Sequence, residues 1–232
     1  MIRITENLPA YFPDPVFAHI RSLHTAFSGS VLAPEFWEQE TSGKMTGFIA
    51  RQGGRCYLWS DGSAADELSE FLDVIGRSEI FCSKETAENC GFEVLESFFA
   101  LHKRVGEKVP TSPAEVSLSA LYTALSKGSD GDVSLPSFEV FAPDLSHRLR
   151  HGGASVHISE KGAGILFLFE GGGIINGISV PYENRRQGSG SEILNDLCQK
   201  AGGDVFAFAK EENLKFYEKN GFSLLGETVI TR

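Results

Sequence analysis

Two patterns of apolar residues follow each other in the second half of the chain, and the rest of the sequence is interpreted relative to them. A β-branched apolar run ends at Val180, a glycine-rich stretch covers 185–190, and apolar residues then return three and four positions apart across 191–200. A short apolar run indicates a buried strand, and the later spacing indicates a helix. Gly177 interrupts the run, which is typical of a bulge or a close backbone approach. The sequence therefore predicts a strand, a tight turn and a helix in that order.

The same periods divide the remaining residues into further helices and strands. Helical spacing predicts helices over 13–27, 66–75, 114–125 and 138–150, with a short one over 34–39. Pro143 is expected to start or break the helix over 138–150, because a proline inside a helix removes a hydrogen bond. Apolar runs predict strands at 45–51, 55–60, 79–83, 92–101, 155–159, 165–169, 204–209 and 222–230. This alternation predicts an α/β protein.

A phosphate group would fit the turn that joins the strand to the helix. Gly188 and Gly190 leave two positions of the turn without side chains, so that successive backbone N–H groups can face one anion. The unpaired amides and the dipole of the following helix favour an anion, and Arg185 and Arg186 add positive charge. The alternative is an ordinary glycine-containing turn between a strand and a helix.

These residues resemble a known family. The pattern Arg185-x-x-Gly188-x-Gly190, after a strand and at the start of a helix, looks like the acetyl-coenzyme A pyrophosphate loop of the GCN5-related N-acetyltransferases. A second block follows the next predicted strand, and it resembles the end of the same fold. Its matching residues are Asn213, Phe216, Tyr217, Gly221 and Phe222. The resemblance covers the second half of the chain.

The resemblance implies an N-acetyltransferase that uses acetyl-coenzyme A as co-substrate and acetylates a primary amine by direct transfer in a ternary complex. It implies a mixed, mostly antiparallel sheet with helices on both faces. The pyrophosphate is expected on the amides of 187–191, the pantetheine arm along 178–180, and the oxyanion at the N–H of Val180. The expected cofactor-binding residues are Ile178, Val180, Arg185, Arg186, Gln187, Gly188, Ser189, Gly190, Ser191, Asn213 and Tyr217.

Catalytic roles follow from the same resemblance. Tyr217 is the expected general acid, because a phenol with a pKa near 10 lies close to a thiol with a pKa near 8.5. The alternative for Tyr217 is a half-buried packing residue. The general base is left open between Glu183, Glu170 and His157, and of these Glu183 is the expected catalytic residue. Cys198 lies in the apolar stripe of a predicted helix and is not expected to act as a nucleophile.

An internal repeat indicates two tandem copies of one α/β unit. At a shift of 126 residues Gly62 falls on Gly188, Leu68 on Leu194, and Lys84-Glu85 on Lys210-Glu211. After a four-residue deletion, Cys90-Gly91-Phe92 meets Asn220-Gly221-Phe222. A proline-containing linker over 107–113 separates the copies. The sequence therefore predicts a degenerate acetyltransferase-like domain over 1–109 and an acetyl-coenzyme A-binding domain over 110–232.

The first copy is not expected to bind coenzyme A. Asp61 stands where a pyrophosphate would lie, no arginine compensates for it, and the deletion is expected to remove the helix that carries the equivalent of Tyr217. The copy retains aromatic residues such as Trp37 and Tyr57. We therefore expect it to form part of the acceptor wall and set specificity, or to stabilise its partner as a built-in pseudo-dimer.

Charge and composition exclude several other classes of protein. The net charge is −10 and both halves carry more acidic than basic residues, which disfavours binding to nucleic acid. No apolar run reaches the roughly 18–20 residues of a membrane span, and no signal peptide is found, so we expect a cytoplasmic protein. The four cysteines lack metal-ligand spacing, so no metal is expected. The spaced acids of 127–132 do not fit a calcium loop and indicate a turn.

The acceptor and the assembly stay open. A small-molecule or peptide amine would serve as acceptor, and neither nucleic acid nor membrane is expected as a partner. The oligomeric state is not predicted beyond a pseudo-dimeric monomer. Two other functions compete with catalysis: a non-catalytic acyl-coenzyme A-binding or regulatory module, and a structural dimerisation protein. Tyr217 favours catalysis over the first, and Arg185 and Arg186 beside the glycines disfavour the second.

Overall fold

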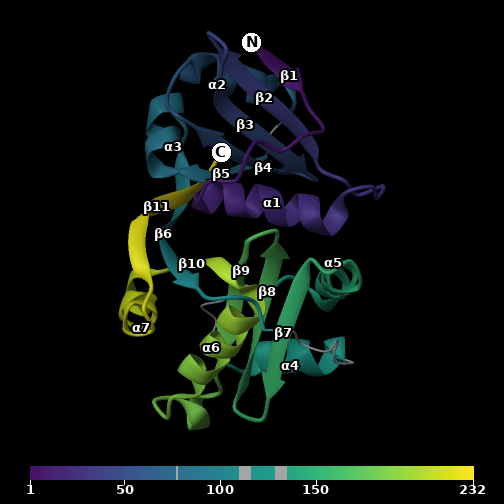
Figure 1. Ribbon diagram of the computed structural model, residues 1–232, viewed down its shortest axis with the longest axis vertical. Helices are drawn as coiled ribbons and strands as arrows, with labels where there is room; N and C mark the ends of the chain where they lie inside the picture. The colour runs from purple at the N-terminus through teal and green to yellow at the C-terminus, as the bar shows by residue number, and fades with distance from the viewer. Residues whose placement is uncertain (77, 110–115, 129–134) are drawn as a thin grey trace.

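One continuous sheet of eleven strands forms the frame of the molecule. The computed structural model describes residues 1–76, 78–109, 116–128 and 135–232 (Figure 1). The strand order is β1-β2-β3-β4-β5-β11-β6-β10-β9-β8-β7, and only the pairs β4–β5 and β9–β10 are parallel. The strands are β1 (Ile2–Ile4), β2 (Glu35–Thr41), β3 (Lys44–Gln52), β4 (Arg55–Ser60), β5 (Glu79–Ser83), β6 (Val94–Val105), β7 (Ala154–Ser159), β8 (Gly162–Phe169), β9 (Gly172–Ser179), β10 (Gly203–Ala209) and β11 (Ser223–Thr231). The predicted mixed and mostly antiparallel sheet is confirmed.

Helices cover both faces of this sheet. On one face α1, α4 and α5 pack against residues such as Ile165, Ile174 and Phe206, and on the other α2, α3, α6 and α7 pack against the alternate residues. The helices are α1 (Pro15–Phe27), α2 (Ala65–Val74), α3 (Lys84–Cys90), α4 (Leu118–Gly128), α5 (Phe138–Arg150), α6 (Ser189–Ala201) and α7 (Leu214–Lys219), with short 3₁₀ turns η1 (Tyr182–Asn184) and η2 (Glu211–Asn213). None of the described helices is both long enough and apolar enough to cross a membrane.

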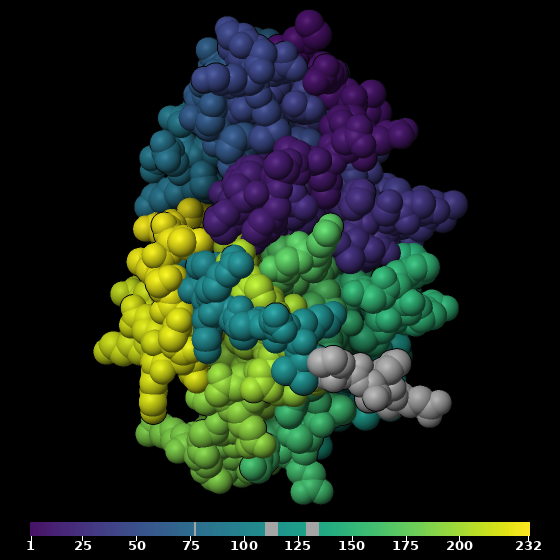
Figure 2. Space-filling view, viewed as in Figure 1, coloured from purple at the N-terminus to yellow at the C-terminus, as the bar shows by residue number. Residues whose placement is uncertain are grey.

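The helix α1 joins the two halves of the chain. Asp14 caps its start by accepting hydrogen bonds from the N–H groups of Val16 and Phe17 at 2.8 and 2.9 Å. One side of α1 packs on the N-terminal strands through Phe17, while Ala18 packs with Ile174 of β9. Figure 2 shows α1 lying across the junction, where the upper and lower parts meet without a gap on this face. The two halves therefore share one continuous core region around α1.

Each half contributes its last strand to the other half. The strand β6 ends the first copy, yet it lies between β11 and β10, and it pairs with β10 from Gly203↔Val105 to Ala209↔Phe99. The strand β11 ends the second copy, yet it lies between β5 and β6. The crossing is visible where the yellow and teal strands meet at the waist of Figure 1. The tandem copies are therefore related by an exchange of strands about the β6–β11 pair.

Three sequence predictions were wrong in detail. The helix predicted over 34–39 is replaced by strand β2, which begins at Glu35. In this strand Phe36 packs in the α1 core and the neighbouring Trp37 contacts Phe71 of α2, so the aromatic pair faces opposite sides of a sheet. Pro143 neither starts nor breaks α5, because it lies on the exposed side, where water can satisfy the carbonyl it leaves unpaired. The helix expected to be lost from the first copy is present as α3.

Two further predictions fall partly outside the described residues. The linker and the domain boundary near residue 110 meet the undescribed stretch 110–115, and most of the turn predicted over 127–132 lies within 129–134. The helix predicted over 114–125 is present from Leu118 as α4. The other predicted helices and strands are confirmed, with ends that differ by a few residues.

Candidate active site

The strand β9 separates from β10 halfway along its length. The parallel pairing of the two strands runs from Gly172 to Ile175 of β9 and stops there. On the other side of β9 the register with β8 slips, so that Ile165 faces Gly177 while Leu166 faces Ile175. Asn176 is the extra residue of this bulge, which confirms the sequence prediction of a bulge beside Gly177. The bulge and the divergence from β10 leave one edge of β9 without a strand partner beyond Ile175.

A tight loop connects β9 to the start of α6. It passes through η1, and Arg186 and Gly188 both have positive φ angles, of 59° and 87°. The hydroxyl of Ser189 donates to the carbonyl of Asn184 at 3.1 Å and closes the loop. The amides of 187–191 make no hydrogen bond with any described residue. Successive free N–H groups at a helix start form a site suited to an anion.

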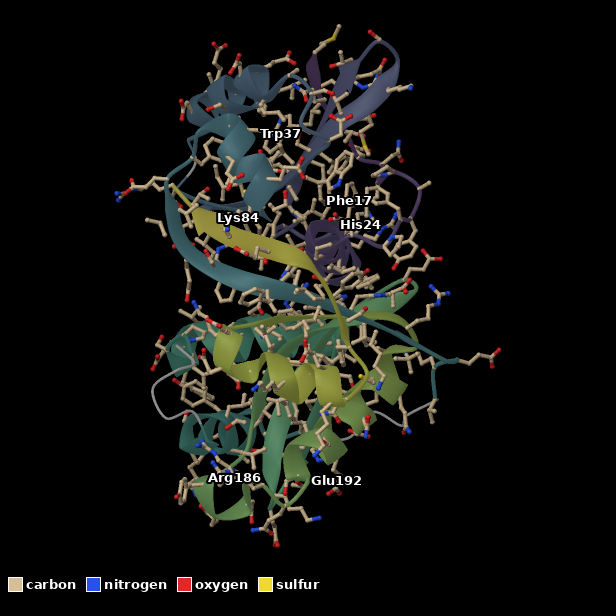
Figure 3. All side chains as sticks on the ribbon, turned by 90° about the vertical axis from the view of Figure 1, so that its left-hand side faces the viewer. Phe17, His24, Trp37, Lys84, Arg186 and Glu192 are labelled. Atoms are coloured by element: carbon tan, nitrogen blue, oxygen red, sulfur yellow. The ribbon has the colours of Figure 1, made fainter. Side chains whose placement is uncertain are left out.

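The two loop arginines have different positions. Arg185 folds back over the loop, and its guanidinium donates to the carbonyls of Val180 at 3.0 Å and Gly128 at 2.8 Å. Arg186 is exposed and makes no hydrogen bond or ion pair with a described residue. In Figure 3 Arg186 and Glu192 lie at the far end of the second half, away from Phe17 and His24. Arg185 therefore holds the loop against α4, and Arg186 is the cation available to a bound anion.

The negative charge of an acidic side chain in the first turn of α6 is balanced by an ion pair with a lysine. Glu192 forms an ion pair with Lys161 of the β7–β8 turn at 3.0 Å, and both side chains are largely exposed. This pairing leaves the start of α6 without a net negative charge from Glu192. The loop consequently keeps the positive character that its free amides and Arg186 provide.

The three candidate bases lie apart from each other. Glu183 is exposed in η1, and its carbonyl accepts from the Gln187 side chain at 2.7 Å. Glu170 is exposed in the β8–β9 turn, at the end of β9 opposite to the loop. His157 lies on β7, with Nδ1 2.8 Å from a carboxylate oxygen of Asp196 on α6. Glu183 is therefore the only one of the three on the loop itself.

Tyr217 lies on the buried side of α7. Its ring packs edge-on against Phe216 and Phe222, and burial, with a smaller contribution from Cys198, raises the pKa of its phenol to about 12. The phenol therefore stays protonated throughout the neutral range, as a general acid requires. Burial also raises the pKa of the Cys198 thiol to about 11, which agrees with its interpretation as a packing residue.

The helix α7 also contacts the loop. A Cβ placed on Gly190 would lie 3.2 Å from the ring of Phe216 and 3.7 Å from Val180, so glycine permits a close approach there. Asn213 lies just before α7, with an exposed side chain that does not cap the helix. Phe216, Val180 and Gly190 thus bring α7, the end of β9 and the start of α6 together. Asn213 lies immediately before α7, and Tyr217 lies within it next to Phe216.

A cavity of about 280 Å³ lies on the face of β9 opposite to α6 and α7. The second half lines it with the bulge residues of β9 and with parts of β8, α4 and α5. The first half lines it with residues of α1 and β4. The lining residues include His19, Leu23, Arg55, Tyr57, Phe141, Asp144, Leu145, Arg148, Ile165, Phe167, Asn176, Gly177 and Ile178. Ile178 is the one predicted cofactor-binding residue that lines this cavity, while the backbone of Val180 lies against Gly128.

The cavity contains a buried cation. Arg148 is 5% exposed, and its guanidinium lies over the rings of Phe167 and Phe27 at 4.1 and 4.8 Å. Nε donates to Asp144 at 3.0 Å, whereas Nη1 is buried with no hydrogen-bond partner among the described residues. Burying a charged donor without a partner is costly, so this arrangement requires an explanation.

His19 faces the same cavity as a neutral group. Burial, together with the charges of Arg148 and Arg55, lowers the pKa of its imidazole to about 3. Its ring packs against Tyr57, Phe81 and Phe208, and it makes no hydrogen bond with a described residue. The sequence analysis missed Arg148, although a signal existed. Arg148 continues the stripe of Phe141 and Leu145, so a charge stands where the helical period requires an apolar residue.

No protein-family model and no curated protein matches the sequence. Solved structures do resemble the fold. A GNAT-family acetyltransferase from Colwellia psychrerythraea is 14% identical, with 100% of this chain and 98% of that chain covered and a TM-score of 0.52. A GCN5-related N-acetyltransferase from Sphaerobacter thermophilus is 13% identical (94% and 91% covered, TM-score 0.56), and one from Kribbella flavida is 14% identical (93% and 93%, TM-score 0.54). The likeness extends over both halves. Among the described residues no group of His, Cys, Asp and Glu is arranged to hold a metal ion.

Proposed function

We propose that this chain, which has the fold of the GCN5-related N-acetyltransferases, transfers an acetyl group from acetyl-coenzyme A to a primary amine by direct transfer in a ternary complex. The separation of β9 from β10 at the Asn176 bulge carries the proposal. The anion-binding loop lies beyond one end of this opening, and the cavity lies on the other face of the same strand. Two substrates can thus reach one segment of backbone from opposite sides.

The loop residues fit the diphosphate of coenzyme A. The free amides of Gln187, Gly188, Ser189, Gly190 and Ser191 would form the cradle. Gly188 has a positive φ angle, and there is open space where its side chain would begin. Charge-assisted hydrogen bonds to such a group contribute roughly 1.5–3 kcal/mol each. Arg186 adds charge, and Arg185 fixes the loop.

The remaining cofactor contacts are assigned along β9 and α7. Ile178 and Val180 would accept the extended pantetheine arm as an added strand along the free edge of β9. Asn213, exposed before α7, would orient the arm from the other side. When bound, acetyl-coenzyme A supplies an activated thioester.

The residues of the chain have three tasks in the transfer. Backbone N–H groups near the bulge would stabilise negative charge on a carbonyl oxygen, and Ile178, which lines the cavity, is better placed for this than Val180, which lies under Gly128. The protonated phenol of Tyr217 would donate to the departing thiolate. Glu183 would take the proton of the amine through water, since it does not line the cavity.

Binding and chemistry are tested in sequence. Thermal stabilisation by acetyl-coenzyme A measures binding, and release of free thiol in the presence of a panel of amines measures transfer. We expect stabilisation in the absence of an amine, and thiol release with at least one amine. Stabilisation without thiol release from any amine would instead favour a non-catalytic acyl-coenzyme A-binding module. Absence of stabilisation would contradict the proposal.

A further inference from the structure

The cavity identifies the chemical class of the acceptor. We propose that the acceptor is a small amino acid-like amine that carries a carboxylate and an apolar side chain, and that Arg148 binds the carboxylate. This inference rests on the proposed function for its amine, but the carboxylate site has its own support in the structure.

Arg148 has more hydrogen-bonding capacity than the fold uses. A guanidinium has five N–H donors, and in this structure one of them, on Nε, has a described acceptor. That acceptor, Asp144, has a side chain 43% exposed, so it compensates the buried charge from the solvent side. Stacking between Phe27 and Phe167 fixes the plane of the guanidinium without supplying any acceptor. A preorganised fork with spare donors is the arrangement that recognises a carboxylate.

The second arginine of the cavity has a partner already. Arg55 donates from Nε to Glu79 at 3.0 Å, across the parallel β4–β5 pair. His19 is neutral, so it neither adds to the cation nor repels an ammonium group. Among the residues that line the cavity, Arg148 is therefore the charge most in need of an anion.

The rest of the lining defines the body of the ligand. Apolar side chains from both halves, including Leu23, Phe141, Leu145 and Ile165, cover most of the wall. A volume of about 280 Å³ lies just below the roughly 300–1,000 Å³ of small-molecule sites, which favours a single amino acid over a peptide. With the carboxylate at Arg148, the amine of such a ligand faces the bulge at Asn176–Ile178.

A matched set of acceptors tests the carboxylate directly. Acetylation rates are measured for leucine, leucinamide and 3-methylbutylamine, and for phenylalanine, phenylalaninamide and phenethylamine. For at least one set we expect kcat/KM of the free amino acid to exceed that of the other two by about 100-fold or more. Acetylation of the amides or decarboxylated amines at equal or higher kcat/KM would overturn the inference while leaving the proposed function intact.

Variants assign the preference to one side chain. Arg148→Met is expected to reduce the preference to less than about fivefold and to leave the affinity for acetyl-coenzyme A unchanged. Arg150→Met removes an exposed arginine from the same helix and serves as the control, with the preference retained. An unchanged preference in Arg148→Met would overturn the assignment. If Arg148→Met does not fold, Arg148→Lys keeps the charge without the fork and is expected to lower the preference at least tenfold.

A binding measurement separates this inference from the proposed function. Calorimetry with leucine and phenylalanine, against their amides, needs no acetyl transfer. Binding that requires both the carboxylate and Arg148, in a protein that acetylates nothing, would support the carboxylate site and contradict the enzyme. Equal binding of acids and amides would contradict the carboxylate site, whatever the activity.

Discussion

The two halves of the chain have the same backbone conformation at two matching positions of the repeat: the turn before a helix, and the end of a later helix. Gly62 before α2 and Gly188 before α6 have φ angles of 86° and 87°. In the helix that follows the next strand, the N–H of Phe92 donates to Ala87 at 3.0 Å, and the N–H of Phe222 donates to Tyr217 at 3.1 Å. The turn and the helix stop were therefore retained in both halves, while the side chains at those positions changed.

The halves differ in which groups accept hydrogen bonds from the backbone N–H groups of the loop. In the first half β4 ends at Ser60, and side chains of the loop bind its amides: Gly62 N–H donates to Ser60 at 3.1 Å, and Ser63 N–H donates to Asp61 at 2.8 Å. In the second half the loop from Ser179 to Gly188 is longer, and its last amides have no described partner. Asp61 thus supplies internally the anion that the second half would take from a ligand.

The helices that follow repeat this contrast. Ser83 caps α3 by accepting from the N–H of Thr86 at 3.0 Å, whereas Asn213 before α7 makes no such cap. Ala87 occupies the place of Tyr217, so the first half has no phenol there. Polar groups in the first half stabilise its own turns, and their counterparts in the second half remain available for a ligand. Substitutions in both halves, and separation of the halves, test this division.

The largest effect is expected from separating the halves. Residues 110–232 alone lack β6, which pairs with β10 along its length and with β11 along most of its own. We expect this fragment to show no cooperative unfolding transition in urea, followed by circular dichroism. Co-expression of 1–109 with 110–232 is expected to restore folding and binding of acetyl-coenzyme A. A fragment 110–232 that unfolds cooperatively by itself would contradict the strand exchange.

The strand exchange also marks the limit of what the sequence could predict. Apolar periods located nearly all helices and strands, and the aligned glycines identified the repeat, because both are local properties. The choice of neighbour for β6 and β11 depends on pairing between strands far apart in the sequence, which a period does not encode. For the same reason the turn between β9 and α6 was predictable as a local structure, but the cavity between α1, β4 and α5 was not.

The two loops are compared directly by placing the same aspartate substitution in each. Gly188→Asp places a carboxylate where the diphosphate would bind, and the loss of two or three charge-assisted hydrogen bonds is expected to weaken acetyl-coenzyme A binding about 100-fold or more. Gly188→Asn has the same shape without the charge and tolerates the positive φ, so it is expected to weaken binding less. Gly62→Asp in the first half is expected to leave affinity unchanged. Calorimetry would contradict the assignment if Gly188→Asp bound as well as the wild type.

A substitution at Tyr217 tests whether the second half uses the phenol that the first half lacks. Tyr217→Phe is expected to lower kcat by about 10–10⁴-fold, the range for a lost general acid, with little change in acetyl-coenzyme A affinity. The pKa of Tyr217 is raised to about 12 by burial, so this group is expected to cause no loss of kcat in the wild type below about pH 11. An unchanged rate would return Tyr217 to a packing role. Urea unfolding serves as the control. The hydroxyl of Tyr217 makes no hydrogen bond with a described residue, so its removal is not expected to destabilise the fold.

The smallest effect is expected at a contact that ties the halves together. Asp204, at the start of β10, is 2% exposed and accepts hydrogen bonds from Tyr11 at 2.6 Å, His102 at 2.8 Å and Arg104 at 2.7 Å. All three partners belong to the first half. Burial alone would raise the pKa of Asp204, but these hydrogen bonds outweigh burial, and the pKa is lowered.

Asp204→Asn is therefore expected to reduce the free energy of unfolding by about 2–3 kcal/mol at pH 7, as for hydrogen bonds to a charged group. A carboxylate whose pKa is lowered by folding stabilises the protein fully above its unfolded pKa, near 3.9, and loses that contribution as the pH falls through the folded pKa. The difference between wild type and Asp204→Asn should thus be constant above about pH 5 and shrink below pH 4. Asp196→Asn, whose partners His157 and Lys200 lie within the second half, is the matched control and is expected to cost about 1 kcal/mol or less. Equal costs for the two variants in urea unfolding would mean that contacts between the halves stabilise the fold no more than contacts within one of them.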